Sequence, residues 1–353
     1  MSLQAPANSR DTGLRTWSGA HPALAGAGAA AGVLAALALT NHLLARRAER
    51  MNPPKGRFLT IHGVRLHYIE RGSGPPIVFL HGNGSMIEDF VSSGLIDLAA
   101  REHRVIVFDR PGYGHSTRPQ GTTWTADAQA RLFYTALERL GVSGALVLGH
   151  SWGCSVAVAM ALRYPDDVKG LVLASGYYYP TARVDMVMAS APAIPLIGDI
   201  VRYTIGPMAA RLMWPVLMRK VFGPAEVPDK FRLFPKEMAV RPSQVFAEAA
   251  ESALMIPTAV KTSDKYGHLK MPVAIVAGDS DRLIHTGQQS WRLHHDVTHS
   301  TFHSVRGAGH MVHQTHTAAL MRAVENIAAQ LPGASPDHEE QDPAVPGDSQ
   351  GGC

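Results

Sequence analysis

A serine at the turn between an apolar strand pattern and an alanine-rich helix pattern constrains this chain more than any other feature. The turn is Gly149-His150-Ser151-Trp152-Gly153, with an apolar run at 145–148 before it and small residues from Cys154 to Tyr164 after it. Glycines two positions before and two after the serine permit a turn so tight that a Cβ at either place would collide with backbone. This pattern is typical of a nucleophile elbow, which lifts a serine hydroxyl above a sheet. We therefore expect a strand–turn–helix unit with Ser151 presented at its turn.

Short apolar runs alternate with helical patterns on both sides of this turn. A hairpin is expected over residues 58–69, turning at His62-Gly63, and a helix from about Thr125 to Leu140. The order indicates an α/β fold, with a mostly parallel sheet covered by helices on both faces. Further strands are expected at 77–80, 105–108, 168–174, 273–277 and 301–305.

The alternation stops between residues 176 and 266. This stretch is rich in Met, Ala and Pro and carries helical patterns at 209–221 and 244–255. It predicts a helical cap, 176–266, inserted after one strand and lying over the carboxyl ends of the sheet. The core is then expected in two parts, 57–175 and 267–331.

A run of uncharged, Ala- and Leu-rich residues covers positions 22–45, after a polar N-terminal segment, 1–21. Its length suits one membrane crossing. A basic linker, 46–56, follows it, and the positive-inside rule would then place the remaining chain in the cytoplasm. A cleaved secretory signal is the alternative, because Arg10 and Arg15 could form its basic end.

Composition excludes several other classes of protein. The net charge is only +4, and no block of Lys and Arg alternates with aromatic residues, so nucleic-acid binding is not expected. Two cysteines, Cys154 and Cys353, are too few for a disulfide framework. The tail, 332–353, is dominated by Pro, Gly, Ser and acidic residues and is expected to be disordered.

Two later loops carry the groups that a serine nucleophile needs. A serine hydroxyl is a weak nucleophile until a base takes its proton. Gly278-Asp279-Ser280-Asp281 follows the strand at 273–277, and Gly307-Ala308-Gly309-His310 follows the strand at 301–305. In a doubly wound sheet, the loops at the carboxyl ends of the strands form the active site. Ser151, a carboxylate from the first loop and His310 are expected to meet there.

These motifs closely resemble those of the α/β-hydrolase family, over roughly residues 58–331. The resemblance implies a doubly wound, mostly parallel, eight-stranded sheet with the cap after strand 6. It implies that Ser151 is the nucleophile and His310 the base. The family spacing Gly-x-x-Asp selects Asp281 as the acid and leaves Asp279 to cap its loop.

The resemblance also assigns supporting roles. The backbone N–H groups of Asn83, which follows His81-Gly82, and of Trp152 would form the oxyanion hole. Asp109 would brace the loop Asp-x-x-Gly-x-Gly-x-Ser. The elbow itself depends on Gly149 and Gly153, and His81 and His150 are interpreted as structural. His313 is interpreted as a helix-surface or supporting residue. The histidines of the C-terminal third lack metal-ligand spacing, so we expect no metal and no other cofactor.

The nucleophile narrows the chemistry that the resemblance implies. Epoxide hydrolases and haloalkane dehalogenases of this family use aspartate where Ser151 stands. Serine esterases, lipases, lactonases, carbon–carbon bond hydrolases and cofactor-free haloperoxidases remain. An apolar substrate passage through the cap is suggested, against the alternative of ordinary cap core, by Met186, Met188, Met208, Met213, Trp214 and Met218.

We expect an esterase or lipase that cleaves an apolar carboxylic ester reached from a membrane surface. The partners expected are the apolar ester substrate and membrane lipid around the N-terminal helix. The alternatives are the other serine chemistries or a non-catalytic, membrane-anchored binding module.

Overall fold

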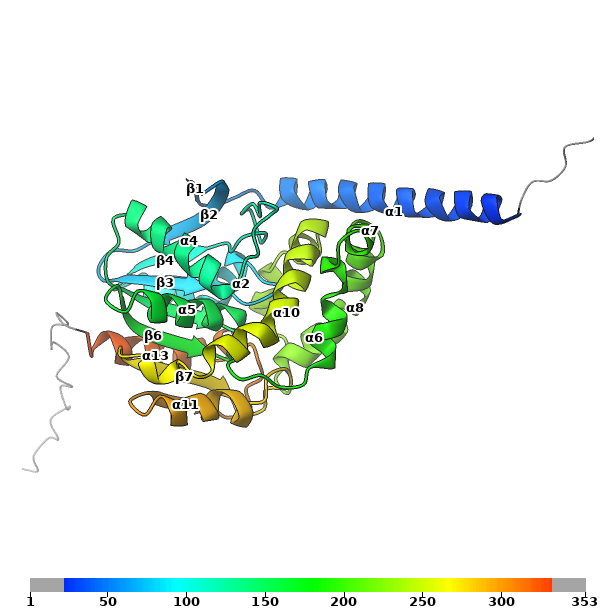
Figure 1. Ribbon diagram of the computed structural model, residues 1–353. Coiled ribbons are helices and arrows are strands. Elements are labelled where there is room, and N and C mark those ends of the chain that lie inside the picture. The colour runs from blue at the N-terminus through cyan, green and yellow to red at the C-terminus, as the bar shows by residue number, and fades with distance from the viewer. Residues whose placement is uncertain (1–21, 332–353) are drawn as a thin grey trace, which may run out of the picture.

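An eight-stranded sheet forms the centre of the computed structural model, which describes residues 22–331 (Figure 1). The strand order is β1-β2-β4-β3-β5-β6-β7-β8. The β1–β2 and β2–β4 pairs are antiparallel and all the other pairs are parallel. The sheet is therefore the mostly parallel, eight-stranded sheet that was predicted. The strands are β1 Arg57–Ile61, β2 Val64–Arg71, β3 Pro76–Leu80, β4 Arg104–Phe108, β5 Ala145–His150, β6 Val168–Ala174, β7 Val273–Gly278 and β8 Thr301–Val305.

Helices cover both faces of this sheet, because the central strands are apolar on both sides. Along β3, Val78 and Leu80 face one core cluster while Ile77 and Phe79 face the other. The first cluster is completed by α4 and α5, and the second by α2, α3, α12 and α13. This alternation is what a parallel strand buried on both faces requires. These helices are α2 Ile87–Ser93, α3 Leu95–Ala99, α4 Ala126–Arg139, α5 Trp152–Arg163, α12 Val312–Thr315 and α13 Thr317–Ala328.

A group of helices stands between β6 and β7, where the sequence predicts a cap. In Figure 1 these helices lie together on one side of the sheet. Between β7 and β8 the chain adds only the π-helical turn η4 Gly287–Trp291 and α11 Arg292–Asp296. The cap elements are α6 Val184–Ala189, η1 Ala191–Ala193, α7 Ile197–Tyr203, α8 Ile205–Phe222, η2 Asp229–Leu233, α9 Lys236–Ala239, α10 Pro242–Thr262 and η3 Tyr266–His268.

The first described helix, α1 Pro22–Met51, projects beyond the rest of the molecule (Figure 1). From Leu24 it is long and apolar enough to cross a membrane, and it is almost entirely unburied. The sequence prediction of a linker from residue 46 is wrong over its first half. The helix continues to Met51 because no Gly or Pro interrupts it before Pro53 and because Ala48 packs into a cap cluster.

The predicted polar segment 1–21, with Arg10 and Arg15, lies outside the described residues. So do the predicted disordered tail 332–353 and Cys353.

Candidate active site

Ser151 lies at the turn between β5 and α5. Its backbone has φ 53° and ψ −119°, a conformation that non-glycine residues rarely adopt. A Cβ on Gly149 would lie 2.6 Å from the Cys154 nitrogen, and one on Gly153 would overlap the Leu80 carbonyl. Neither position has room for a Cβ, and the role of the two glycines in a nucleophile elbow stays a prediction.

Asp281 and His310 meet at the carboxyl edge of the sheet. His310 Nδ1 lies 2.8 Å from Asp281 Oδ2, and both side chains are buried. The second carboxylate oxygen of Asp281 accepts the backbone N–H groups of Leu283 and Ile284, at 2.8 and 2.9 Å. The Asp281 carboxylate is thus fixed from both sides, and the other ring nitrogen of His310, Nε2, is left for a second partner.

Asp279 points away from His310. Its Oδ1 accepts the backbone N–H of Gly307 at 2.8 Å and the Ser280 hydroxyl at 2.8 Å, and the residue is exposed. Asp279 therefore ties the loop after β7 to the loop after β8. Of the two candidate acids, Asp281 is the one that the structure pairs with the histidine.

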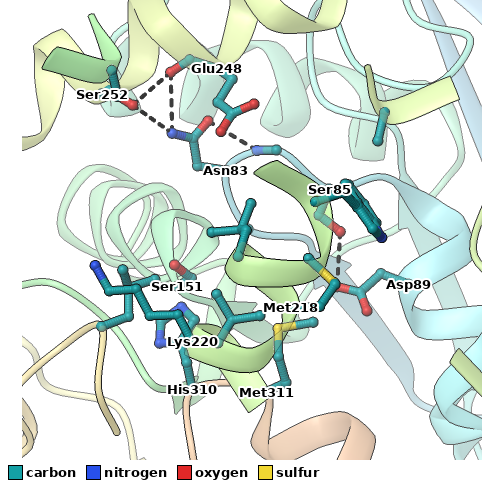
Figure 2. A pocket seen from close by; sticks show the side chains of 18 of the residues that line it. Asn83, Ser85, Asp89, Ser151, Met218, Lys220, Glu248, Ser252, His310 and Met311 are labelled. Carbon is teal, nitrogen blue, oxygen red and sulfur yellow. Dashed lines mark hydrogen bonds between the residues drawn. The ribbon is translucent and has the colours of Figure 1, made fainter. Parts of the chain in front are cut away.

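Ser151 and His310 line the same cavity (Figure 2). No hydrogen bond joins their side chains among the residues drawn there. Catalytic hydrogen bonds are often long until substrate binds, so the shared cavity is the relevant geometry.

Asn83, on the loop after β3, and Trp152, the residue after Ser151, are the two residues expected to form the oxyanion hole. Within residues 22–331 neither backbone N–H donates to another protein group. Nδ2 of Asn83 donates to Glu248 O and Ser252 Oγ of α10, and Oδ1 accepts the backbone N–H of Gly84 (Figure 2). Asn83 Oδ1 also lies 2.5 Å from the Tyr113 hydroxyl oxygen. The loop after β3 is therefore held by the cap while its N–H remains available to an oxyanion.

The loops behind these donors are held by Asp109 and His81. Asp109 accepts the backbone N–H groups of Ile87 and His115, both at 2.9 Å, and lies 2.7 Å from His67 Nδ1. His81 donates to the Gly82 carbonyl and accepts the N–H of Arg110. Burial and the Arg110 charge lower the pKa of His81 to about 4, so the ring is neutral at pH 7. Asp109 and His81 thus hold the backbone of these loops, and a purely structural role for each stays a prediction.

A buried ion pair that the sequence gives no reason to expect joins this region to the cap. Arg110 and Glu251 are fully buried and linked at 2.5 Å. Arg110 also donates to the carbonyls of His81 and Gly82, both at 2.8 Å. Tyr113 donates to the second oxygen of Glu251 at 2.7 Å. One carboxylate on α10 thus fixes the position of the loop that carries the Asn83 N–H.

Replacing Glu251 with leucine should destabilise the protein by about 3 to 5 kcal/mol, because Arg110 would be left as an uncompensated buried charge. Urea denaturation of Glu251→Leu measures this. Asp229→Asn is the control, since it breaks the exposed Arg232–Asp229 pair and should leave the midpoint unchanged. A loss below about 1 kcal/mol for Glu251→Leu would contradict this account of the pair.

A second buried network lies beneath His310. His150 Nε2 lies 3.1 Å from the His310 carbonyl, and its ring lies 4.1 Å from that of His313, centroid to centroid. His313 Nε2 in turn lies 3.0 Å from Asp89 Oδ1, and both residues are buried. Of the two interpretations of His313, that of a helix-surface residue is wrong, because α12 packs against α2 and the ring is buried. The interpretation as a supporting residue is left.

Asp89, His150 and His313 also offer ligand atoms that all lie within 4.8 Å of one another. The Asp89 carboxylate, however, already accepts from Ser85 Oγ and Gln314 Nε2, both at 2.8 Å. We interpret the cluster as a support for the His310 loop.

The cavity above Ser151 has a volume of about 390 Å³ and is largely apolar. Met186, Met213, Trp214 and Met218 of the cap line it, as the sequence suggests. Met188 and Met208 do not line it and are exposed. The main polar groups from α10 are Ser252 and Glu248. Burial and the nearby Glu251 raise the pKa of Glu248 to about 7.

Comparison with known proteins supplies the context for this geometry. A family model described as the alpha/beta hydrolase fold matches residues 75–317. Haloalkane dehalogenase 2 of Mycobacterium bovis is 30% identical over 148 residues, which are 40% of this chain and 51% of that protein. The chain thus spans about half the length of the first curated relatives it matches.

Two further matches cover more of the chain. The 2-hydroxy-6-oxo-2,4-heptadienoate hydrolase of Pseudomonas putida is 24% identical over 289 residues, 79% of this chain and 98% of that protein. A solved structure of a thermophilic esterase from Thermogutta terrifontis superposes with a TM-score of 0.64 at 20% identity, covering 78% of this chain and 99% of that one. At that identity the superposition shows the shared fold.

Proposed function

Because this chain belongs to the alpha/beta hydrolase fold family, we propose that it is a serine hydrolase that cleaves an apolar carboxylic ester. The observation that carries the proposal is the Asp281–His310 pair beside Ser151 at the base of one apolar cavity. A side chain that can act as nucleophile, one that can act as base and an acid that orients the base are all present there.

In the proposed reaction His310 Nε2 takes the proton of Ser151 as the serine oxygen attacks the acyl carbonyl. The backbone N–H groups of Asn83 and Trp152 stabilise the oxyanion, and one such donor is typically worth about 3 kcal/mol. His310 then protonates the leaving alcohol. Water repeats the sequence and frees the serine. Asp281 holds the imidazole in one tautomer throughout and keeps its negative charge.

The relatives act on several bond types, so membership of the family does not decide which bond is cleaved. The choice of an ester is the part of this proposal that goes beyond the family. Ser151 stands where an aspartate nucleophile would be expected in a dehalogenase or epoxide hydrolase. Carbon–carbon bond hydrolysis is the second candidate, supported by the 79% coverage of the match to the P. putida hydrolase. The largely apolar cavity favours an ester with an apolar acyl chain.

A series of p-nitrophenyl esters tests the acyl preference. Each added methylene that the cavity buries should raise kcat/KM about fourfold, because burial of a CH₂ is worth about 0.8 kcal/mol. The rise should stop when the cavity is full. A 2-hydroxy-6-oxo-dienoate, assayed beside the series, separates the second candidate. Faster turnover of the dienoate than of every ester would overturn the ester proposal.

We also propose that α1 anchors the protein in a membrane, with the catalytic domain on the cytoplasmic side. The exposed apolar helix and the basic residues Arg46, Arg47 and Arg50 at its C-terminal end support this. Processing as a signal sequence is the alternative, and mass spectrometry of the membrane-bound protein distinguishes the two, since cleavage removes α1.

A further inference from the structure

The outer surface of the cap is unusually apolar. Among the described residues outside α1, most of the exposed large apolar side chains lie between residues 188 and 217. A folded protein in water rarely exposes so many together without a binding role. We define the cap face as the exposed side chains of Leu196, Ile197, Ile200, Ile205, Met208 and Leu212 on α7, α8 and the residue before α7.

The arginines between residues 188 and 217 are paired with acidic side chains, so their charges do little to disfavour contact with an apolar partner. Arg202 is mostly buried and paired with Asp199 at 2.6 Å. Arg211 is also mostly buried and contacts Glu237 at 2.9 Å. Since both arginines carry their own counter-charges, the cap face can enter a medium of low polarity at a smaller desolvation cost.

Helix α1 is fixed to the cap at the junction between α7 and α8. The buried Asn41 amide donates to the Thr204 carbonyl at 2.5 Å and the Tyr203 carbonyl at 3.1 Å, and Asn41 Oδ1 accepts from Arg211. Farther along α1, Glu49 pairs with Arg241 at 2.8 Å. The direction in which α1 leaves the protein is therefore set by the cap.

This direction places the cap face next to any bilayer that α1 enters. Residues 24–40, which precede the Asn41 contact, span roughly 25 Å as a helix, close to the roughly 30 Å of a hydrocarbon core. In Figure 1 the cap helices α6, α7 and α8 lie on the side of the molecule toward which α1 projects. The surface of the bilayer would therefore lie near Asn41, against α7 and α8.

The cavity reaches the same surface. Met213 and Leu217 on α8 line the cavity and are also 53% and 39% exposed. Ala189, at the end of α6, lines it as well and is exposed. Side chains that line the cavity and are also exposed thus lie on both α6 and α8, and Ser151 belongs to the same lining.

We propose that the cap face docks into the lipid bilayer entered by α1 and that the substrate is a membrane-resident acyl lipid, which reaches Ser151 between α6 and α8. The occupant is a bilayer because the face is continuous with a helix of membrane-spanning length. The choice of substrate rests on the proposed ester hydrolysis, but the docking does not.

Site-specific fluorescence tests the docking without catalysis. The full chain carrying Cys353→Ser and Leu212→Cys is labelled with a polarity-sensitive dye and reconstituted into phosphatidylcholine–phosphatidylglycerol vesicles. Cys154 is buried and should not react. The matched control is Leu233→Cys, since Leu212 and Leu233 are 79% and 75% exposed and Leu233 lies on η2, which packs against α2.

The dye at 212 should be quenched by spin labels on the acyl chains, at every protein-to-lipid ratio, and the dye at 233 should not. Equal quenching at the two positions would overturn the proposal. An apolar environment of the dye at 212 that appears only at high protein density would also overturn the proposal, because a second copy of the protein would then cover the cap face.

Activity measurements test the route of the substrate. Leu196→Glu/Leu212→Glu should lower turnover of a vesicle-borne phospholipid by about tenfold or more, and leave turnover of a soluble short-chain ester unchanged. Leu233→Glu should change neither. An equal loss on both substrates would overturn the route. A wild-type protein that is inactive on every soluble ester would instead contradict the proposed function. The fluorescence test of docking does not depend on activity and would be unaffected.

Discussion

Ser151→Ala is expected to lower kcat/KM for a soluble ester by about 10⁴-fold or more. Alanine lacks the hydroxyl that attacks the ester, and a water molecule in the place of that hydroxyl does not restore the reaction. The variant should fold normally. Alanine differs from serine only by the hydroxyl, and the turn geometry depends on Gly149 and Gly153 on either side.

A fluorophosphonate probe measures the same property directly, since it reacts with an activated serine. Wild-type protein should be labelled and Ser151→Ala should not. Ser155→Ala is the matched control: Ser155 lies one turn later on α5, is buried, and does not line the cavity. Labelling that persists in Ser151→Ala, or is lost in Ser155→Ala, would mean that the nucleophile is a different residue.

The sequence predicts the core of this fold well because its signals are local. The strands from β3 to β7 are short, mostly apolar runs, and the bounds that the sequence predicts for them lie within about two residues of the observed ones. The hairpin at His62-Gly63 and the start of α4 at Thr125, whose hydroxyl caps the helix, are also local features. The elbow is predictable for the same reason, since Gly149 and Gly153 leave little room for any other conformation.

Interactions between distant residues could not be predicted in this way. Arg110 and Glu251 are 141 residues apart, and nothing near either residue marks it as one half of a buried pair. His313 and Asp89 come from α12 and α2, which are far apart in the sequence and are brought into contact only by the fold as a whole. Within the site, the residues alone do not distinguish Asp279 from Asp281 as the acid, because both lie within one short loop, and only the family spacing favours Asp281.

Asp281→Asn is expected to lower kcat for ester hydrolysis by about 10⁴-fold. The asparagine can keep its Oδ1 on the backbone N–H groups of Leu283 and Ile284, so the loop should retain its shape. Its NH₂ group would then face His310 Nδ1 and donate to it. The ring proton would move to Nε2, the nitrogen that has to accept the proton of Ser151, and the base would be lost without any loss of fold.

Asp279→Asn is the matched control, two residues earlier in the same loop. Its remaining carbonyl oxygen can still accept the Gly307 N–H, so turnover should fall by no more than about twofold. Stopped-flow assays of both variants, with thermal unfolding to verify the fold, make the comparison. If Asp279→Asn lost the larger share of activity, the acid would have to be Asp279 and the Asp281–His310 hydrogen bond would have only a structural role.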